Sequence, residues 1–270
     1  MSNTPFSWKD KVVVITGASR GIGEAIATLL GQRGAVLGLI SRSRSQLEDV
    51  LMHCGNHGAV ASADIADRYA LEDALNSLRD ALGDPDVLIN NAGIGHYGAV
   101  VDTAPEVYER LMAVNYFGTV WATRLVLPAM ISRGAGEIVN IASIAGKLAA
   151  PFEAAYSATK FAVVGFTEAL AVELTGTGVN VRMINPGPVD TSFFEARGST
   201  YQRSFPPMVS AHTVALAVER AIRTGRMQEA VPRWLDLGPA AKALFPSLYF
   251  WGARQVFRPE IARSGKPLQR

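Results

Sequence analysis

Two residues in the stretch "AAYSATKFAVVGF" (154–166) could perform acid–base chemistry. Alanine dominates this stretch and no proline interrupts it, so it predicts a helix on which Tyr156 and Lys160 share one face. A free tyrosine is a poor proton donor and acceptor at neutral pH because its pKa is about 10. A neighbouring ammonium favours the phenolate and brings that pKa closer to neutral. Tyr156 is therefore a candidate proton donor and acceptor, and Lys160 a candidate for lowering its pKa, although two such residues alone are usually exposed on a helix surface.

The elements that would position this pair follow an α/β pattern. Short apolar runs predict strands at 11–16, 35–41, 58–62, 86–90, 136–142 and 178–185, with a last strand near "EAVP" (229–232). Segments rich in Ala, Leu, Glu and Arg predict helices at 21–33, 67–81, 106–132, 154–175 and about 210–224. This alternation indicates a doubly wound parallel sheet with right-handed crossovers. Ser143 follows the fifth strand, so its hydroxyl should emerge at the carboxyl edge, where such folds bind ligands.

A glycine-rich turn, "TGASRGIG" (16–23), follows the first strand and opens the first helix. Glycines let the backbone turn tightly and approach a pyrophosphate, and the helix N-terminus supplies free N–H groups. The residues of this turn assigned to a dinucleotide are Gly17, Ser19, Arg20, Gly21, Ile22 and Gly23. Taken alone, such a turn can also be an ordinary connection without a ligand.

The end of the second strand bears on the choice of dinucleotide. An NAD-binding domain usually carries an acid there for the ribose 2′-hydroxyl, but this chain has Ser41 followed by Arg42. Serine and arginine can accept a 2′-phosphate, and Arg20 could contact it from the other side. Arg44 is expected to be a solvated residue at a helix start. These residues favour NADP(H) over NAD(H).

Two further stretches are expected to position the cofactor. Asp64, after the third strand, could accept a hydrogen bond from the adenine amino group, with the Ile65 N–H beside it, or it could cap a helix. The stretch "NNAG" (90–93) ends the fourth strand with polar side chains and a glycine. Its residues Asn91, Ala92 and Gly93 would bring the backbone close beneath a flat ligand.

Together, these motifs resemble the short-chain dehydrogenase/reductase family. The match combines "TGASRGIG", "NNAG", "VNYFGT" (114–119), "IASIAG" (141–146), "YSATK" (156–160) and "PGPVDT" (186–191). It covers roughly residues 9–192 in the family's order and spacing, whereas the last third matches only loosely. The resemblance implies a single Rossmann-type domain over residues 1–270, with about seven strands in the order 3-2-1-4-5-6-7.

The resemblance also implies roles for individual residues. It implies a catalytic tetrad formed by Asn115, Ser143, Tyr156 and Lys160. In the family, the lysine also bonds the nicotinamide ribose, and the carbonyl of the asparagine holds a water that links the lysine to solvent. The nicotinamide loop would use Pro186, Gly187, Val189 and Thr191. By family precedent the pro-S face of the ring offers hydride, and no metal ion is expected.

The substrate pocket should be lined by residues 94–97, 144–153 and the loop 186–210. Their large side chains are Ile94, His96, Tyr97, Leu148, Phe152, Phe193, Phe194, Tyr201 and Phe205. This lining suits an apolar alcohol or carbonyl compound, and His96 could bind substrate or be a solvated loop residue.

The extension 231–270 is aromatic and basic, and from residue 233 it carries seven Lys or Arg against two acids. It could serve as a lid, a subunit-packing arm or a segment on an anionic membrane surface.

The sequence therefore predicts an NADP(H)-dependent oxidoreductase that interconverts an alcohol and a ketone or aldehyde. The tail resembles those of family members that act on steroids, retinoids or other lipids. The alternatives are a 3-oxoacyl reductase acting on a carrier-bound thioester and an NADPH-binding redox sensor without turnover.

A net charge of +2 argues against nucleic-acid binding. A single cysteine, Cys54, and no apolar stretch of about 18 residues indicate a cytoplasmic protein. Family precedent implies a homodimer or homotetramer packed through 106–132 and 154–175.

Overall fold

A seven-stranded parallel sheet forms the centre of the computed structural model, which describes residues 6–201, 203 and 205–263. Its strands are β1 (Val12–Thr16), β2 (Val36–Ser41), β3 (Gly58–Ser62), β4 (Val87–Asn90), β5 (Gly136–Ile141), β6 (Val179–Pro186) and β9 (Gln228–Val231). They lie in the order β3-β2-β1-β4-β5-β6-β9, and every neighbouring pair is parallel. This confirms the predicted order, because β9 is the seventh strand of this sheet along the chain. The short strands β7 (Val189–Asp190) and β8 (Val209–Ser210) pair separately.

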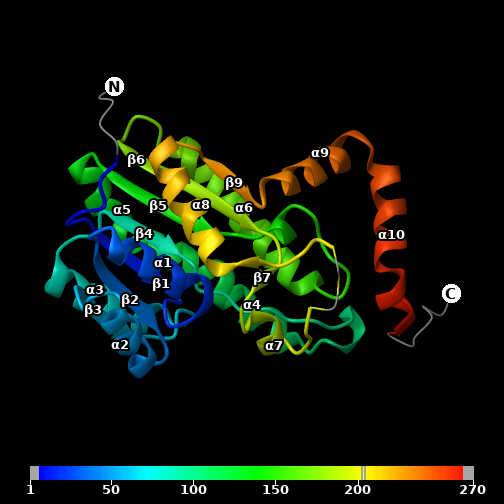
Figure 1. Cartoon of the computed structure of the whole chain (residues 1–270), viewed down its shortest axis with the longest axis horizontal. Coiled ribbons are helices and arrows are strands. Elements are labelled where there is room, and N and C mark those ends of the chain that lie inside the picture. Colours follow the sequence, from blue (N-terminus) through cyan, green and yellow to red (C-terminus); the bar gives the residue numbers. More distant parts are fainter. Residues whose placement is uncertain (1–5, 202, 204, 264–270) are drawn as a thin grey trace.

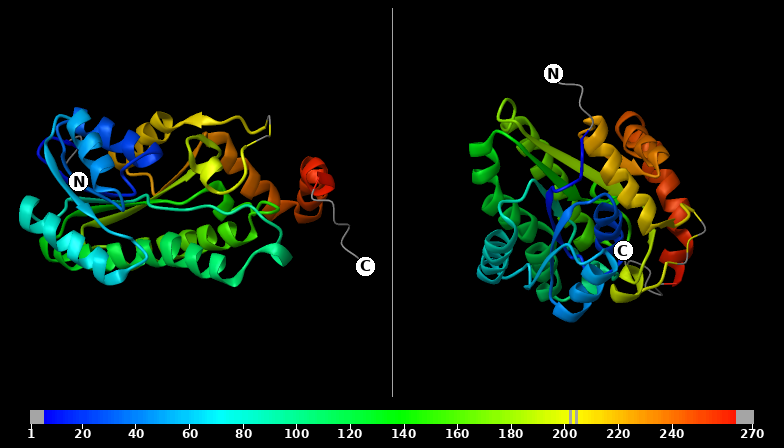
Figure 2. Two further views of the ribbon diagram at one scale, coloured as in Figure 1. Left: turned by 90° about the horizontal axis from the view of Figure 1, so that it is seen from below. Right: turned by 60° about the vertical axis from the view of Figure 1, so that its left-hand side comes forward.

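Helices cover both faces of the sheet, in the two layers that Figures 1 and 2 show. The helices of one layer are α1 (Gly21–Gln32), α2 (Arg44–His53) and α8 (Ala211–Thr224). Those of the other layer include α3 (Arg68–Leu82), α5 (Gly118–Arg133) and α6 (Ala154–Glu173). Alternate strand residues serve the two layers, so that Val13 and Ile15 pack with α1 whereas Val14 packs with α3. This is why the strands are apolar at nearly every position.

The segment predicted as one helix over 106–132 is divided into three parts. It consists of α4 (Pro105–Met112), a π-helical turn η2 (Ala113–Phe117) and α5. A π-helical turn widens the helix by one residue and is frequent at functional sites. Here the turn contains Asn115, which it holds almost completely buried.

Two parts of the last third of the chain, between β6 and α8 and after β9, lie beyond the carboxyl edge of the sheet. After β7 come α7 (Phe193–Ala196) and β8, and after β9 come η4 (Arg233–Asp236), α9 (Leu237–Leu244) and α10 (Pro246–Arg263). Figure 1 shows α9 leading away from the sheet and α10 lying apart from the body of the protein. The remaining short helices are η1 (Val100–Asp102) and η3 (Ile144–Gly146). Within the described ranges, no helix has both the length and the apolar character to cross a bilayer.

Candidate active site

A cavity of about 1000 Å³ opens at the carboxyl edge of the sheet. The turn after β1 and the ends of β2, β3 and β4 line one end of it, and the loops after β5 and β6 line the other. All the predicted cofactor and catalytic residues line this cavity except two, Gly23 and Asn115, which lie behind its wall. The structure thus brings residues from six strand ends into one space.

The glycine-rich turn is held in shape by the end of β4. Gly17 has a φ of 66°, and a Cβ there would stand 2.7 Å from the Cα of Ala92. The Asn91 side chain donates hydrogen bonds of 3.0 Å to the carbonyl oxygens of Thr16 and Gly17. A Cβ on Gly23 would collide with the Gly17 carbonyl. The close approach of backbone to backbone therefore requires glycine here, and it leaves the space that a pyrophosphate would fill.

Cationic side chains stand at the same end of the cavity. Arg20 occupies the N-cap position of α1 and makes no capping hydrogen bond, so the first N–H groups of this helix remain available to an anion. Arg20 and Arg42 line the cavity, and neither forms an ion pair with any residue that the structure describes. Arg44 begins α2 and pairs with Glu48 at 2.8 Å, as a solvated residue at a helix start would. The uncapped helix and the unpaired arginines fit a phosphorylated dinucleotide.

Asp64 lies beside these cations and does not cap a helix. The cap of α3 is Asp67, whose carboxylate accepts hydrogen bonds from the backbone of that helix, so the capping interpretation of Asp64 is wrong. Asp64 instead accepts from the Ala66 N–H at 3.0 Å and from Arg110 at 2.7 Å. Partial burial raises the pKa of Asp64. The two hydrogen bonds and the charges of Arg110 and Arg42 lower it by more, so the net shift is downward. Its predicted contact with adenine stays a prediction.

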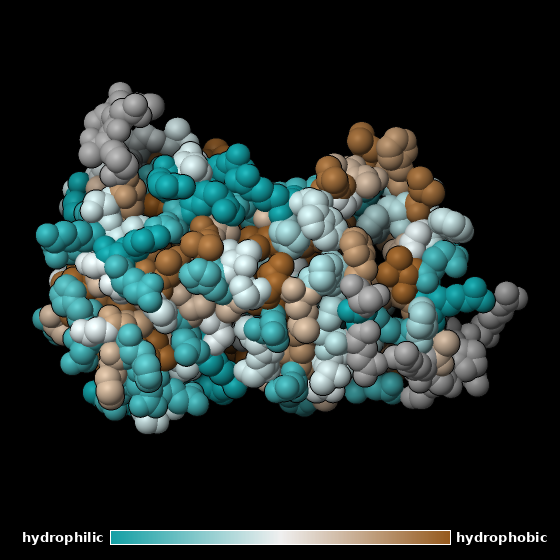
Figure 3. Space-filling model, in the orientation of Figure 1, coloured by the Kyte–Doolittle hydropathy of each residue, from teal (hydrophilic) through white to brown (hydrophobic). Residues whose placement is uncertain are grey.

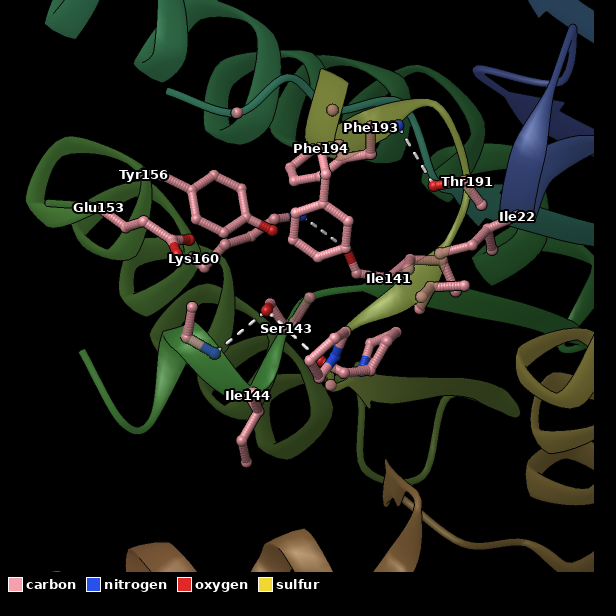
Figure 4. Close-up of a pocket in the computed structure, with 18 of the residues that line it drawn as sticks. Ile22, Ile141, Ser143, Ile144, Glu153, Tyr156, Lys160, Thr191, Phe193 and Phe194 are labelled. Carbon is pink, nitrogen blue, oxygen red and sulfur yellow. Dashed lines mark hydrogen bonds between the residues drawn. The ribbon is translucent and has the colours of Figure 1, made fainter. Parts of the chain in front are cut away.

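Ser143 and Tyr156 face one another across the middle of the cavity (Figure 4). Ser143 is the N-cap residue of η3, where its Oγ accepts from the Ala145 N–H at 3.1 Å and lies 3.4 Å from the Pro186 carbonyl. Tyr156 stands in the first turn of α6 and packs against the ring of Phe193, with 5.6 Å between centroids. The long contact to Pro186 leaves the serine hydroxyl free to turn toward a substrate oxygen.

Lys160 lies behind Tyr156 and is buried. Its Nζ donates a hydrogen bond of 2.9 Å to the Ile141 carbonyl and lies 5.9 Å from the centroid of the Tyr156 ring. Burial lowers the pKa of Lys160 to about 8. The ammonium is therefore turned toward the end of β5 and not toward the phenol.

The pKa of Tyr156 is raised above its ordinary value, mainly by burial. A hydrogen bond with Ser143 acts against this shift, the charge of Glu153 adds to it, and the charge of Arg197 reduces it. The sequence predicts that Lys160 brings this pKa closer to neutral, but the net shift is upward. The physical reason is that desolvation of the phenol dominates while the lysine ammonium is occupied by a backbone carbonyl.

Asn115 supports the site from behind. Its side chain accepts a 2.8 Å hydrogen bond from the Ile94 N–H and donates to the Ile94 carbonyl and to Thr159 Oγ1, both at 2.9 Å. It therefore ties the loop after β4 to α6, one residue before Lys160. Its own carbonyl accepts from Thr119 Oγ1 at 3.1 Å. The water-binding role that the resemblance implies for this carbonyl stays a prediction.

The predicted nicotinamide loop closes over the glycine-rich turn. Gly187 donates its N–H to the Val231 carbonyl at 2.8 Å, which fixes the loop to the edge strand β9. Thr191 lies against Gly21, because a Cβ on that glycine would stand 3.3 Å from the threonine methyl group. Pro186, Gly187, Val189 and Thr191 all line the cavity. The loop is placed where it could hold a ring between the turn and Tyr156.

Most of the residues predicted to line the substrate pocket line this cavity. Those that line the cavity are Ile94, Leu148, Phe193, Phe194, Tyr201 and Phe205. His96, Tyr97 and Phe152 do not line it. His96 lies 3.1 Å from Thr103 Oγ1, and the rings of Tyr97 and Phe152 pack together at 5.5 Å. His96 is thus neither directed at the cavity nor fully solvated.

Two groups of residues make contacts that sequence patterns did not identify, although a lid was one use predicted for the tail and both 144–153 and 186–210 were expected to line the pocket. One is the tail, which contributes Trp234, Leu237, Phe245, Leu248, Tyr249 and Phe257 to the cavity wall. The other is a buried ion pair between Glu153 and Arg197, with 2.7 Å between Oε1 and Nη1. The position of Glu153, three residues before Tyr156, was a signal that could have suggested proximity. Arg197 lies in a segment without periodicity, and no local pattern pointed to it.

A Rossmann-type sheet with a glycine-rich turn and a serine, a tyrosine and a lysine at its carboxyl edge defines a class of dinucleotide-binding oxidoreductases. The family model described as short chain dehydrogenase matches residues 11–202. The chain therefore belongs to the short-chain dehydrogenase family, and the resemblance seen in its motifs is confirmed.

Its relatives include animal and bacterial proteins. The chain is 34% identical over 262 residues to dehydrogenase/reductase SDR family member 7B of Bos taurus, covering 90% of this chain and 80% of the relative. It is 37% identical over 187 residues to an uncharacterized oxidoreductase of Staphylococcus epidermidis, covering 69% of this chain and 81% of the relative. Both matches extend over most of each protein.

Two solved structures are similar to this one and carry cofactors. One is a variant of actinorhodin polyketide ketoreductase with NADPH, with a TM-score of 0.77 and 31% identity over 86% of this chain and 99% of that one. The other is an alcohol dehydrogenase from Thermococcus sibiricus with 5-hydroxy-NADP, with a TM-score of 0.71 and 27% identity over 78% and 90%. These neighbours support binding of a nicotinamide cofactor by this chain.

Proposed function

We propose that the protein is an NADP(H)-dependent oxidoreductase that interconverts an alcohol and a ketone or aldehyde. The observation that carries the proposal is the position of Ser143, Tyr156 and Lys160 in the same cavity as the glycine-rich turn. The cofactor, when bound, supplies or accepts the hydride. A proton-transferring group and a polarising hydroxyl then stand beside the carbonyl that hydride would reach.

The residues of the chain divide the remaining chemistry among them. Ser143 donates a hydrogen bond to the substrate oxygen and favours charge on it. Tyr156 gives its proton to that oxygen during reduction and takes the proton back during oxidation. Lys160 lines the cavity and donates one hydrogen bond to the Ile141 carbonyl at 2.9 Å, so its ammonium has further donors with which to bond a ribose hydroxyl. Asn115 holds the loop after β4 against α6 and so keeps these groups in register.

NADP(H) is the cofactor that the charges favour. Arg20 and Arg42 line the cavity and are unpaired among the described residues, and Ser41 stands where an acid would repel a 2′-phosphate. Both solved neighbours described above were determined with NADP-type cofactors. Asp64 and Ile65 lie at the same end of the cavity and are proposed to contact the adenine.

The substrate is proposed to be apolar. The walls beyond Tyr156 are formed by aromatic and aliphatic side chains of the loop and the tail, with Phe205 stacked on Trp234 at 5.1 Å between centroids. Such a lining suits a lipophilic alcohol or carbonyl compound, as steroids, retinoids and other lipids are. In this proposal the chain is one domain in which residues 231–270 act as a wall of the substrate pocket.

The proposal is tested by following NADPH oxidation with ketones and aldehydes graded by chain length and ring content. We expect kcat/KM to rise with apolar size by roughly threefold per buried methylene. Phe257→Ala, in the tail, should lower kcat/KM for the largest substrates and leave the smallest ones nearly unchanged. A protein that binds NADPH but oxidises none across the panel would be a redox sensor, and the proposed reaction would be wrong.

A carrier-bound 3-oxoacyl thioester is the second candidate substrate. The similarity to actinorhodin polyketide ketoreductase favours it, as do the exposed basic residues Arg254 and Arg258 on α10, which also lines the cavity. An acidic carrier could dock against such residues. Comparing a carrier-linked ketone with the corresponding free ketone distinguishes the two, because only the second candidate requires a large preference for the carrier.

Assembly into a cytoplasmic homodimer or homotetramer is also proposed. Apolar side chains stay exposed around η2, α5 and α6, namely Phe117, Ile131, Phe161 and Val172. Light scattering gives the oligomeric state.

Exposed apolar residues also gather on α9 and α10, the brown area at the upper right of Figure 3. Sedimentation with anionic vesicles tests whether this surface binds a membrane.

A further inference from the structure

The short helix α7 is fastened to the first turn of α6 at two points. Phe193 packs its ring against Tyr156, with 5.6 Å between centroids. One helical turn later, Nη1 of Arg197 lies 2.7 Å from Oε1 of Glu153. Glu153 is the N-cap residue of α6, but its side chain does not cap the helix. Both contacts therefore join the α7 segment (residues 191–199) to the residues that surround the proposed proton donor.

The Arg197 side chain is surrounded by groups that hold it in place. Its guanidinium lies 4.6 Å from the centroid of the Phe194 ring and 5.1 Å from that of the Tyr97 ring. Its Nε donates to the Ser199 carbonyl at 3.2 Å. Arg197 is 6% exposed and Glu153 is 9% exposed, so this is a buried ion pair. Nη1 of Arg197 has no hydrogen-bond partner among the described residues, so the pair is held by the attraction of its charges and not by an aligned hydrogen bond.

Stability alone is a weak explanation of such a pair. Removing two charges from water costs several kcal/mol, and apolar residues of similar volume are often at least as stabilising. Glu153 also lines the cavity, where a buried carboxylate influences any proton transfer nearby. We propose that Glu153 and Arg197 are positioning residues of the reaction: docking of the α7 segment sets Arg197 against Glu153 and neutralises the carboxylate beside Tyr156. This inference rests on the proposed function.

The charges around Tyr156 determine the direction of the effect. Ser143 faces it from the end of β5, Lys160 lies 5.9 Å from its ring centroid, Phe193 covers it, and the charges of Glu153 and Arg197 act on it. Arg203 acts on Glu153 from the loop before β8. The Glu153 charge raises the pKa of Tyr156 and the Arg197 charge lowers it. Without Arg197 the phenolate is less favourable, so alcohol oxidation, which needs the phenolate as base, requires a higher pH. Without Glu153 the opposite holds.

The experiment measures alcohol oxidation against pH in the full-length protein. Arg197→Met should move the rising limb of the pH profile of kcat to a pH higher by roughly one unit, and Glu153→Gln should move it to a lower pH by a similar amount. The double variant should return toward wild type, and it also avoids a buried unpaired charge if the single variants fold poorly. Arg197→Lys retains the charge and should keep the wild-type limb. Glu195→Gln removes an exposed acid from the same helix and is the matched control.

Two readouts that do not need turnover accompany these rates. Hydrogen exchange over residues 191–199 should quicken in Arg197→Met. Carbon NMR of labelled tyrosine follows the Tyr156 signal, which is identified by its loss in Tyr156→Phe. The pH midpoint of this signal should be lowest in Glu153→Gln and highest in Arg197→Met. If wild type oxidises no alcohol, the proposed function fails while the order of these midpoints still tests the pair. Unchanged midpoints, or a lower kcat at every pH with an unmoved limb, would overturn the positioning role.

Discussion

Replacing Tyr156 with phenylalanine is expected to lower kcat by roughly 10³-fold or more, while NADPH affinity stays close to that of wild type. The reason is that the phenylalanine ring keeps the packing against Phe193 but has no proton to give to the substrate oxygen. The pyrophosphate end of the cavity, formed by the turn after β1, is not altered. Steady-state rates give kcat, and fluorescence titration with NADPH gives the dissociation constant.

Tyr116→Phe provides the matched control for this change. Tyr116 packs edge-on against Phe166, with 6.3 Å between centroids, and does not line the cavity. Loss of its hydroxyl should leave kcat unchanged. Steady turnover by the Tyr156 variant would show that another group transfers the proton, and a parallel loss of NADPH binding would show that the substitution disturbs the site as a whole.

Replacing both Arg20 and Arg42 with alanine is expected to weaken NADPH binding by roughly 100-fold, about tenfold for each arginine, and to leave NADH binding nearly unchanged. Both side chains are exposed at the cavity and lack ion-pair partners within the described part of the chain. They can therefore turn to a 2′-phosphate without breaking an ion pair, and NADH has no such phosphate. Dissociation constants for the two cofactors measure the ratio directly.

Arg44→Ala is the control, because Arg44 lies two residues from Arg42 but is already paired with Glu48 at 2.8 Å. It should preserve the ratio of NADPH to NADH affinity and cost little stability, as exposed pairs within one helix do. Equal weakening of both cofactors in the double variant would mean that the arginines bind the shared pyrophosphate, and the assigned preference for NADP(H) would be wrong.

Much of the fold follows from local patterns in the sequence. Strands buried between two helical layers are apolar at nearly every position, so runs such as "VVVI" in β1 are readable without any tertiary information. The π-helical turn around Asn115 was not predictable in the same way. It interrupts a continuous helical pattern and is stabilised by hydrogen bonds to Ile94 and Thr159, which come from other elements.

Many of the residues that line the cavity could likewise be predicted from the sequence, because parallel strands all end at one edge and the residues that follow them must meet there. This principle predicted that the glycine-rich turn, Ser143 and the loop after β6 lie around one space, and they line the same cavity. It could not give the direction of the Lys160 ammonium, which depends on the distance to the Ile141 carbonyl, or the upward shift in the pKa of Tyr156, which depends on how completely the phenol is buried.

The sequence by itself determined the class of fold, the family and the set of residues at the carboxyl edge, because each depends on short motifs and on the period of apolar residues. Only the tertiary structure decided which distant segments complete the site. Glu153 meets Arg197, and Glu260 of α10 binds Arg203 and Tyr97, because the chain folds back on itself there. Charges paired across such distances leave no periodic trace in the sequence, since their contact depends on packing and not on spacing.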